Sequence, residues 1–496
     1  MMSNSVMLNN IYAPGAGTDI ESAITGKPDG RLSDERQTKI FADLIKKLEH
    51  HRQYLEDCFV DKTDIRFQFS TDQKMQNLMN QHRPREKMTD DALIIPPINI
   101  VMNVRDITGR RWTIIPTMYA WEQIIRQLGM GKQFFHILGE YNSHLLNENL
   151  NFMMDRLPSC KFLLRLVSLS KTPVSSSDSK DSSCPFVLRA FLPDNFSRMD
   201  NVYISNAIQK GLSKIPQEVG DISYSLNSND MVVDISFAEI QELTEVNEEY
   251  MSGLRVRASE VGRYQYILVM IILKRLVCDN GMTISAEGGE IHIPYFSRGI
   301  SPDRSPNKPP YPTTRGQSKN MDAIIIEIQK IMESVENSIG NAVKGYENAI
   351  QEYTQNANEF INSFPAKDAL FNSDDDIRAA VILAFSRMGI SAIGGAKSED
   401  VVRHFKKEEK DWNDRYRNKE TKIEPHLGWV FLNAITRYAA HEIILDNLYL
   451  AQNIQSAVIE KLLNPQIITW NNIAAEINDN REQRKKDAAT PSKSTI

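Results

Sequence analysis

Hydrophobic and polar positions alternate most clearly in residues 253–284. Positions 254–259 (Leu-Arg-Val-Arg-Ala-Ser) follow a period of two, which predicts a strand with one buried face. The run 266–273 is apolar on both faces and too short to cross a bilayer, so it predicts a central strand buried on both sides. Asn280 and Gly281 then give a strong signal for a type I′ hairpin turn. A sheet core therefore lies in this part of the chain.

The same patterns divide the rest of the chain into strands and helices. Short apolar or alternating runs predict two hairpins, which turn at Asp106–Gly109 and at Asn227–Asp230. The predicted strands are 66–70, 94–104, 110–116, 162–169, 185–193, 222–226 and 231–237. Helical spacing predicts helices at 34–59, N-capped by Ser33, and at 119–128, 134–147, 321–364, 374–389, 398–416, 429–445 and 451–463.

The order of these elements predicts an α+β fold, with an antiparallel or mixed sheet core and flanking helices, followed by an all-helical C-terminal domain. A proline-rich stretch, SRGISPDRSPNKPPYPTTRGQSK, separates the two parts as an extended linker. The predicted divisions are a disordered N-terminus at 1–31, a sheet domain at 32–296 with a Ser-rich loop at 170–184, the linker at 297–320, a helical domain at 321–478 and a disordered tail at 479–496.

Composition is that of an ordinary soluble protein, with 41% hydrophobic and 25% charged residues. The net charge of -6 excludes a cationic surface over the whole protein but not a local basic patch. Four cysteines without a CxxC pair favour free thiols in a reducing compartment. The sequence shows no secretory signal and no run of about 18 apolar residues, so we expect a cytoplasmic protein without a membrane partner.

Several motifs carry a family resemblance. Residues 259–262 read Ser-Glu-Val-Gly, and residues 275–282 read Arg-Leu-Val-Cys-x-Asn-Gly-Met. Upstream, 146–151 read Leu-x-x-Asn-Leu-Asn, and 187–201 read VLRAFLPDNFSRMDN. A late helix contains Asn-Ala-x-Thr at 433–436. Together these motifs resemble the signature of the phage/plasmid-like proteins, a family of unknown function found in bacteriophages and conjugative plasmids.

The resemblance covers residues 95–441 in ordered pieces. Pro193 and Phe196 replace the Ser and Tyr that are usual in the family, so those two hydroxyls are missing here. The resemblance implies a mobile-element origin in a bacterial host cell, and it brings no activity with it. It assigns a buried polar or motif role to Arg189, Ser259, Glu260, Gly262, Arg275, Cys278, Asn280, Gly281 and Asn433.

Glu260 is a candidate for chemistry because a carboxylate interrupts a strand-like run there. If Glu260 is buried it needs a partner, and Arg189, Arg263 and Arg275 are the candidates. A structural ion pair is the default interpretation, and ligand binding or acid–base chemistry is the alternative. Cys278 would be a nucleophile only beside a base that the sequence does not supply, and otherwise it behaves as a small hydrophobic residue.

Two further patterns have structural explanations. The segment from Gly389 to Ser398 has the residue types of a phosphate loop in the wrong register, so we predict a helix C-cap at Gly389 and the next N-cap at Ser398. The nine histidines include no HExxH pair. His426 and His441 flank a predicted helix, where surface or capping roles are expected. We therefore predict no metal and no cofactor.

Basic and aromatic residues give a signal for nucleic-acid binding. They lie around the first hairpin tip and on one strand face, and they are Arg105, Arg110, Arg111, Trp112, Arg255 and Arg257. A sheet surface of this kind can neutralise phosphates and stack bases. The alternative is a solvated edge whose arginines pair with nearby acids such as Glu245, Glu248 and Glu249.

Three hypotheses follow. The leading one is a non-enzymatic phage or plasmid accessory protein that binds DNA, in single-stranded form during replication or recombination, and forms homo-oligomers through its helical domain. The second is a scaffold or inhibitor that binds a host or phage protein. The third is an enzyme in which Glu260, Cys278 and Asn280 share one pocket.

Overall fold

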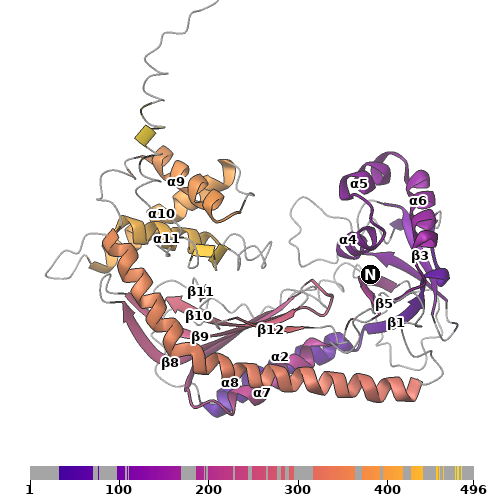
Figure 1. The fold of residues 1–496 in the computed structure, drawn as a ribbon, viewed down its shortest axis with the longest axis horizontal. Helices are drawn as coiled ribbons and strands as arrows, with labels where there is room; N and C mark the ends of the chain where they lie inside the picture. The colour runs from indigo at the N-terminus through magenta and orange to yellow at the C-terminus, as the bar shows by residue number, and fades with distance from the viewer. Residues whose placement is uncertain are drawn as a thin grey trace, which may run out of the picture.

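The fold is α+β and contains two sheets, as the computed structural model shows (Figure 1). The structure describes residues 33–70, 76–77, 98–106, 109, 111–168, 186–194, 196, 199–226, 230–243, 248–263, 266–275, 281–284, 290–294, 317–363, 371, 373–390, 395–416, 426–439 and isolated positions between 454 and 482. The N-terminus at 1–31, the Ser-rich loop and most of the linker lie outside these residues.

The first sheet is mixed and has the strand order β1-β5-β6-β4-β3-β2. Only β4 and β6 pair in parallel among its described pairings. Its strands are β1 (Leu55–Asp61), β2 (Ile65–Phe69), β3 (Ile100–Arg105), β4 (Arg111–Pro116), β5 (Lys161–Ser168) and β6 (Phe186–Pro193), with a 3₁₀ turn η1 (Lys62–Asp64) between β1 and β2. One face is covered by α4 (Met118–Gln127), α5 (Lys132–Tyr141) and α6 (Ser143–Arg156).

The edge strand β2 is protected by a side chain. The amide of Asn151 on α6 donates to the carbonyl of Phe67 at 2.9 Å and accepts from its N–H at 2.9 Å. Asn151 therefore takes the place of a neighbouring strand, which blocks an edge that could otherwise pair with another chain. This contact gives a physical role to the last residue of the Leu-x-x-Asn-Leu-Asn run.

The second sheet has the order β11-β10-β9-β8-β7, with β12 also paired to β10, and its described pairings are antiparallel. Its strands are β7 (Val219–Leu226), β8 (Met231–Leu243), β9 (Glu248–Ala258), β10 (Tyr266–Arg275), β11 (Gly281–Ile284) and β12 (Glu290–Pro294). As predicted, β10 is central and buried on both sides.

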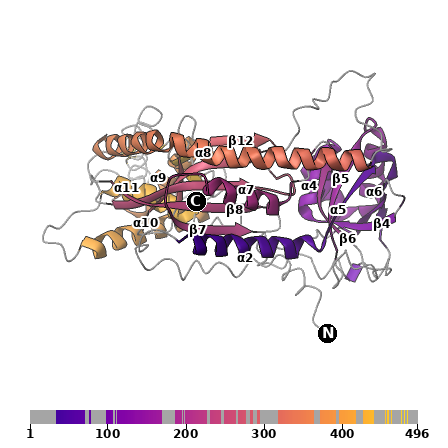
Figure 2. The same cartoon turned by 90° about the horizontal axis from the view of Figure 1, so that it is seen from below.

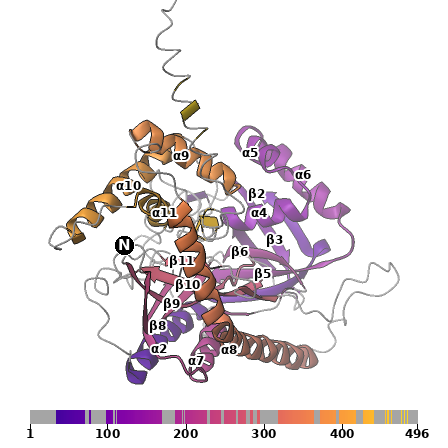
Figure 3. The same ribbon diagram turned by 60° about the vertical axis from the view of Figure 1, so that its left-hand side comes forward.

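Helices cover both faces of the second sheet. On one face, α2 (Asp34–Arg52), α7 (Asn201–Leu212) and α8 (Gln317–Ser363) lie side by side (Figure 2). On the other side lie α9 (Asp374–Arg387), α10 (Gly395–Tyr416) and α11 (Leu427–Tyr438) (Figures 1 and 3). Buried apolar residues of α2, α7, the second sheet and α8–α11 belong to one cluster, so the helices after residue 320 share the core of this sheet.

Several predicted boundaries were wrong for a tertiary reason. The helix predicted at 34–59 begins after Ser33, whose hydroxyl accepts from the Arg36 N–H, but it ends at Arg52. The residues that follow pair with β5 instead, because that pairing buries Cys58 and Val60. The helix predicted at 134–147 is two helices, separated at Asn142, whose side chain caps α6.

Two turn and cap predictions were also wrong. Gly281 lies in β11 opposite Lys274, so the hairpin does not turn at Asn280 and Gly281. Gly389 follows the end of α9 with φ 74°, as predicted, but Ser398 lies inside α10 and is fully buried. In the described part of the chain, no helix combines the length and apolarity that crossing a bilayer requires.

Candidate functional site

The outer strands of the first sheet, β4, β3 and β2, present a polar face on the side away from α4–α6. Val104, Met102 and Ile114 point into the core beneath the helices, so the residues that alternate with them point the other way. The apolar residues on that side, Val101 and Ile115, are buried. The polar ones are Arg66, Gln68, Asn103, Arg105, Arg111 and Thr113, which we call the basic face; Asn103 is half-buried and the others are exposed.

The basic face is open because only half of this side of the first sheet packs against the second sheet. On the same side, β1, β5 and β6 carry Phe59, Leu163 and Leu192, which pack into the core of the second sheet. The strands β2, β3 and β4 lie beyond this contact. One half of the face therefore joins the two sheets, and the other half meets solvent.

The centre of the basic face is a ladder of neutral hydrogen bonds. Asn103 donates to the amide oxygen of Gln68 at 2.7 Å, and the Thr113 hydroxyl donates to the amide oxygen of Asn103 at 3.0 Å. The strands β2, β3 and β4 contain three arginines and no Asp or Glu. Arg66 pairs with Asp155 at 3.0 Å. The face is therefore locally basic in a chain whose net charge is -6.

Arg105 and Arg111 lie directly opposite each other across the β3–β4 pair. Both are exposed, and in the described part of the chain neither guanidinium has a carboxylate partner. Like charges directly opposite on antiparallel strands destabilise a sheet. An anion bound between the two arginines would remove that repulsion.

Trp112 does not belong to this face, and the prediction that it stacks bases was wrong. Its indole N–H donates to Asp106 at 3.2 Å, and its ring packs edge-on against Phe186 with centroids 4.7 Å apart. Both contacts place the ring on the helix-covered side of the sheet. Arg110 lies outside the described residues.

Arg255 and Arg257 were predicted to form a second cationic surface, and this prediction was wrong. Their side chains are buried, with 5% and 6% of their surface exposed. Arg255 makes two hydrogen bonds to Asp234, at 2.6 and 2.7 Å, and a third to Gln455 at 3.2 Å. The C-terminal residues therefore cover this side of β9, and an aspartate neutralises Arg255.

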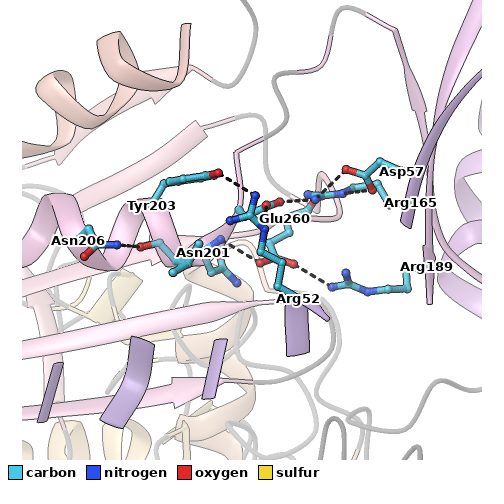
Figure 4. Close-up of polar contacts among 10 residues, drawn as sticks. Arg52, Asp57, Arg165, Arg189, Asn201, Tyr203, Asn206 and Glu260 are labelled. Atoms are coloured by element: carbon cyan, nitrogen blue, oxygen red, sulfur yellow. Dashed lines mark hydrogen bonds and ion pairs between the residues drawn. The ribbon is translucent and has the colours of Figure 1, made fainter. Parts of the chain in front are cut away.

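Glu260 lies where the two sheets meet, in the loop between β9 and β10 (Figure 4). One carboxylate oxygen pairs with Arg189 of β6 at 3.1 Å, and the other accepts the backbone N–H of Asn201 at 2.9 Å. Asn201 is the first residue of α7, and the α7 N-cap Asp200 makes no side-chain capping bond. Glu260 therefore caps α7 from a distant loop. This is the ion pair with Arg189 that we named as one candidate.

Arg165 joins the same network from β5, and we did not predict it. Its guanidinium donates to both oxygens of Asp57, at 3.1 and 3.2 Å, and to the Glu260 carbonyl at 2.8 Å. It also pairs with Asp200. Arg165 is fully buried, so these partners compensate the loss of its hydration (Figure 4). A single arginine within the run Phe-Leu-Leu-Arg-Leu-Val was the signal for a buried ion pair.

The network shifts the pKa of several of its groups, among them Glu260, Asp200 and His51. Burial alone would raise the pKa of Glu260, but Arg189, Arg165 and the Asn201 N–H lower it below its ordinary value. Burial raises the pKa of Asp200, against the opposing effect of Arg165. Burial also lowers the pKa of His51 to about 4, and the charge of Arg189 adds to this effect. Glu260 is therefore ionised, and both of its carboxylate oxygens are bonded to protein groups, which is typical of a structural residue.

The loop that carries Glu260 is held tightly against the first sheet. Gln123 of α4 donates to the Val261 carbonyl at 2.8 Å and accepts from the Phe191 N–H at 2.7 Å. Gly262 has φ 70°, and a Cβ there would lie 2.5 Å from a methyl carbon of Leu192. The Ser259 hydroxyl accepts from the Arg263 N–H at 3.1 Å. The Ser-Glu-Val-Gly motif therefore joins the two sheets.

Among the remaining candidates that the structure describes, Arg263 and Asn433 have other surroundings than the Glu260 carboxylate. Arg263 pairs with Asp230 at 2.9 Å instead of with Glu260. The strand β10 ends at Arg275, whose side chain lies outside the described residues, as do Cys278 and Asn280. The pocket proposed for Glu260, Cys278 and Asn280 therefore stays a prediction. Asn433 is buried in α11, a helix that is distant in sequence from the Glu260 loop.

Histidine acts as a cap, as predicted at one position. The Nδ1 atom of His426 accepts the Trp429 N–H at 3.1 Å at the start of α11, and Nε2 lies 2.9 Å from the Ile361 carbonyl oxygen. Nε2 must therefore carry the proton and donate to that carbonyl. Among the described residues, no group of three His, Cys, Asp or Glu side chains could hold a metal ion.

Comparison with known proteins adds no assignment: no family model, no curated protein and no solved structure matches the chain.

Proposed function

We propose that this protein binds DNA without catalysis, through the basic face of the first sheet. The observation that carries the proposal is the exposed cross-strand pair of Arg105 and Arg111. Two exposed guanidinium groups side by side, without a carboxylate partner among the described residues, form a ready site for a phosphate group. In the neutral ladder next to them, the amide groups of Gln68 and Asn103 retain N–H donors for phosphate oxygens, whereas the Thr113 hydroxyl already donates its proton to Asn103.

The composition of the basic face favours the DNA backbone over the bases as the part recognised. Trp112 is half-buried on the opposite side of the sheet, and the six residues of the face include no aromatic ring. Stacking, which gives most single-strand binders their tolerance of any base, is therefore not supplied by this face. The expected binding is independent of sequence, strongly dependent on salt, and similar for single strands and duplexes.

A fluorescence anisotropy titration tests the proposal directly. Labelled single-stranded and duplex oligonucleotides would be titrated with the whole chain and with the variant R105Q/R111Q. The variant R36Q/R126Q is the matched control, because it removes the same charge from exposed positions on α2 and α4. We expect R105Q/R111Q alone to bind more weakly than the unmodified chain. Equal binding by all three proteins would reject the basic face as the site.

The origin of the protein is a second part of the proposal. We propose an accessory role in a bacteriophage or plasmid, in replication or recombination within a bacterial host. The support is the resemblance of the motifs at 259–262, 275–282 and 433–436 to those of the phage/plasmid-like proteins. Recovery of the coding sequence beside phage or plasmid replication genes would support this role.

A second candidate function, binding of another protein, is favoured by one observation. Large apolar side chains are exposed on α5 and α6, on the side of the first sheet opposite the basic face. Solvent-exposed apolar patches of this kind mark interaction surfaces. Co-purification of one partner at fixed stoichiometry, lost on substitution of these side chains, would favour this function.

A further inference from the structure

The helices α5 and α6 carry a second apolar stripe in addition to the one they bury. On α5, Phe134, Ile137 and Tyr141 are 50%, 49% and 78% exposed. On α6, Leu145 and Phe152 are 42% and 54% exposed. Tyr141 and Leu145 flank the junction at Asn142, so the apolar positions continue from one helix to the next. We call these five residues the apolar surface.

The core of the first sheet does not need these side chains. The buried side of α5 is formed by Phe135, which packs on Trp121 with ring centroids 5.2 Å apart, and by Gly139, where a Cβ would lie 3.0 Å from Ile98. The buried side of α6 is formed by Leu146, Leu150 and Met154. A helix that is apolar on two sides is normally buried on two sides. The exposed side of α5 and α6 is therefore suited to contact another molecule.

The charges beside the apolar surface restrict the partner. The charged residues of α5 and α6 are Lys132, Glu140, Glu148, Asp155 and Arg156. The three acids outnumber the two bases here, which disfavours a nucleic acid as the partner. A helix that lies on an anionic membrane would instead carry Lys and Arg on its polar side. A protein surface with both signs of charge fits best.

The outer side of α6 is complementary to itself. Glu148, Phe152 and Arg156 are spaced four residues apart, so they lie in one row along the helix. All three are exposed, and the Arg156 guanidinium lies 4.7 Å from the Phe152 ring centroid. If two copies of α6 pack antiparallel about a twofold axis at Phe152, each Glu148 faces the Arg156 of the other copy. Isologous contacts of this kind are the commonest in homo-oligomers.

We propose that a second copy of this chain covers the apolar surface and that the protein forms a twofold dimer through α5 and α6. With about half of each large side chain exposed, the surface measures roughly 500 Å² per copy, or about 1,000 Å² in the pair. This area is near the lower limit for a specific interface, so the dimer is expected to dissociate on dilution. The proposal is independent of DNA binding.

The dimer also differs from the oligomer predicted from the sequence. That oligomer was expected to form through the helical domain. The apolar seam of α8 packs inside the chain, where Val335 and Ile339 are fully buried. Gly211 of α7 lies against Ile339, since a Cβ at Gly211 would come within 2.7 Å of it. In the described parts of α8–α11, Ile382 is the one exposed large apolar residue.

Sedimentation velocity over about 1–100 µM protein, without DNA, tests the proposal. The whole chain is compared with variants in which the charges at positions 148 and 156 are exchanged. E148R and R156E each place like charges across the twofold axis at two symmetric positions. Each is therefore expected to weaken dimerisation about tenfold. The double variant E148R/R156E restores opposite charges and should restore the dimer. E49R on α2 is the matched control and should dimerise as the unmodified chain does.

The variant F152D should be monomeric, and thermal unfolding of each variant would show that it is folded. A chain that stays monomeric at the highest concentration overturns the proposal. A dimer that persists in F152D, or single charge reversals that the double variant does not rescue, also overturns it, because assembly would then use another surface.

Discussion

The carboxylate of Glu260 accepts the backbone N–H of Asn201 at 2.9 Å, and so a residue between β9 and β10 caps α7. The other oxygen of the same carboxylate pairs with Arg189 in the first sheet. One side chain therefore joins a helix that covers the second sheet to a strand of the first. The relative position of the two sheets, which leaves the basic face open, depends on this contact.

The substitution E260Q should destabilise the fold by about 3 kcal/mol, because it leaves Arg189 buried without its counter-charge. The amide still fits the site and can accept one hydrogen bond, so the loss of stability reports mainly the removal of the negative charge and not a change in side-chain shape. Urea unfolding followed by circular dichroism gives the free energy difference. E49Q on α2 is the exposed control and should change stability by less than about 0.5 kcal/mol. A similarly small effect of E260Q would show that the ion pair does not hold the sheets together.

His51 should make the protein less stable as the pH falls from about 6.5 to 4. Burial lowers its pKa to about 4, so in this range the unfolded chain binds a proton that the folded chain does not. The stabilisation is fully present above about pH 6.5 and is lost toward pH 4. From 1.36 kcal/mol per pKa unit, the loss amounts to about 3 kcal/mol.

The contribution of His51 can be isolated by comparing H51Q with H50Q over the same pH range. The exposed neighbour His50 is the control, and H50Q should keep the pH dependence of the unmodified chain. The raised pKa of Asp200 acts in the opposite direction, but it is common to both variants. Parallel curves for H51Q and the unmodified chain would contradict the assignment.

Two glycine substitutions should have opposite effects. In β9, a Cβ at Gly253 would lie 1.9 Å from the Ile235 carbonyl oxygen, so G253A must separate β8 from β9 and should cost more than about 3 kcal/mol. In α8, a Cβ at Gly340 meets nothing within 4 Å, so G340A should stabilise by about 1 kcal/mol through helix propensity. Thermal unfolding of G253A and G340A measures the two stability changes. Equal effects would mean that β8 and β9 do not approach as described.

Local patterns were enough to predict most of the strands and the basic hairpin, although they predicted a helix over β1 and no strand at β12. The turn at Asp106–Gly109 sets the register of β3 and β4, and the register alone places Arg105 opposite Arg111. Short-range signals of this kind do not depend on the rest of the fold. For the same reason β7 and β8 lie where the alternation predicted strands, and the central strand β10 lies at the predicted run that is apolar on both faces.

Long-range contacts were beyond the reach of those patterns. The alternation at 254–259 is typical of a strand with a solvated polar face, but Gln455, 200 residues later, covers Arg255. The residues after Arg52 continue a helical pattern, yet pairing with β5 converts them to a strand. In both places burial against a distant segment outweighs local preference. Arg165 could have been recognised, because a lone charge in an apolar strand needs a buried partner.

The salt dependence of DNA binding tests the central claim most directly. The slope of log Kobs against log salt concentration counts the phosphate contacts, at about 0.9 per contact on duplex DNA. Because Arg105 and Arg111 are proposed to share one phosphate group, we predict that R105Q/R111Q has a slope smaller by about 1 than the unmodified chain, while R36Q/R126Q keeps the full slope. An unchanged slope in R105Q/R111Q, or no salt-dependent binding by the unmodified chain, would contradict the account.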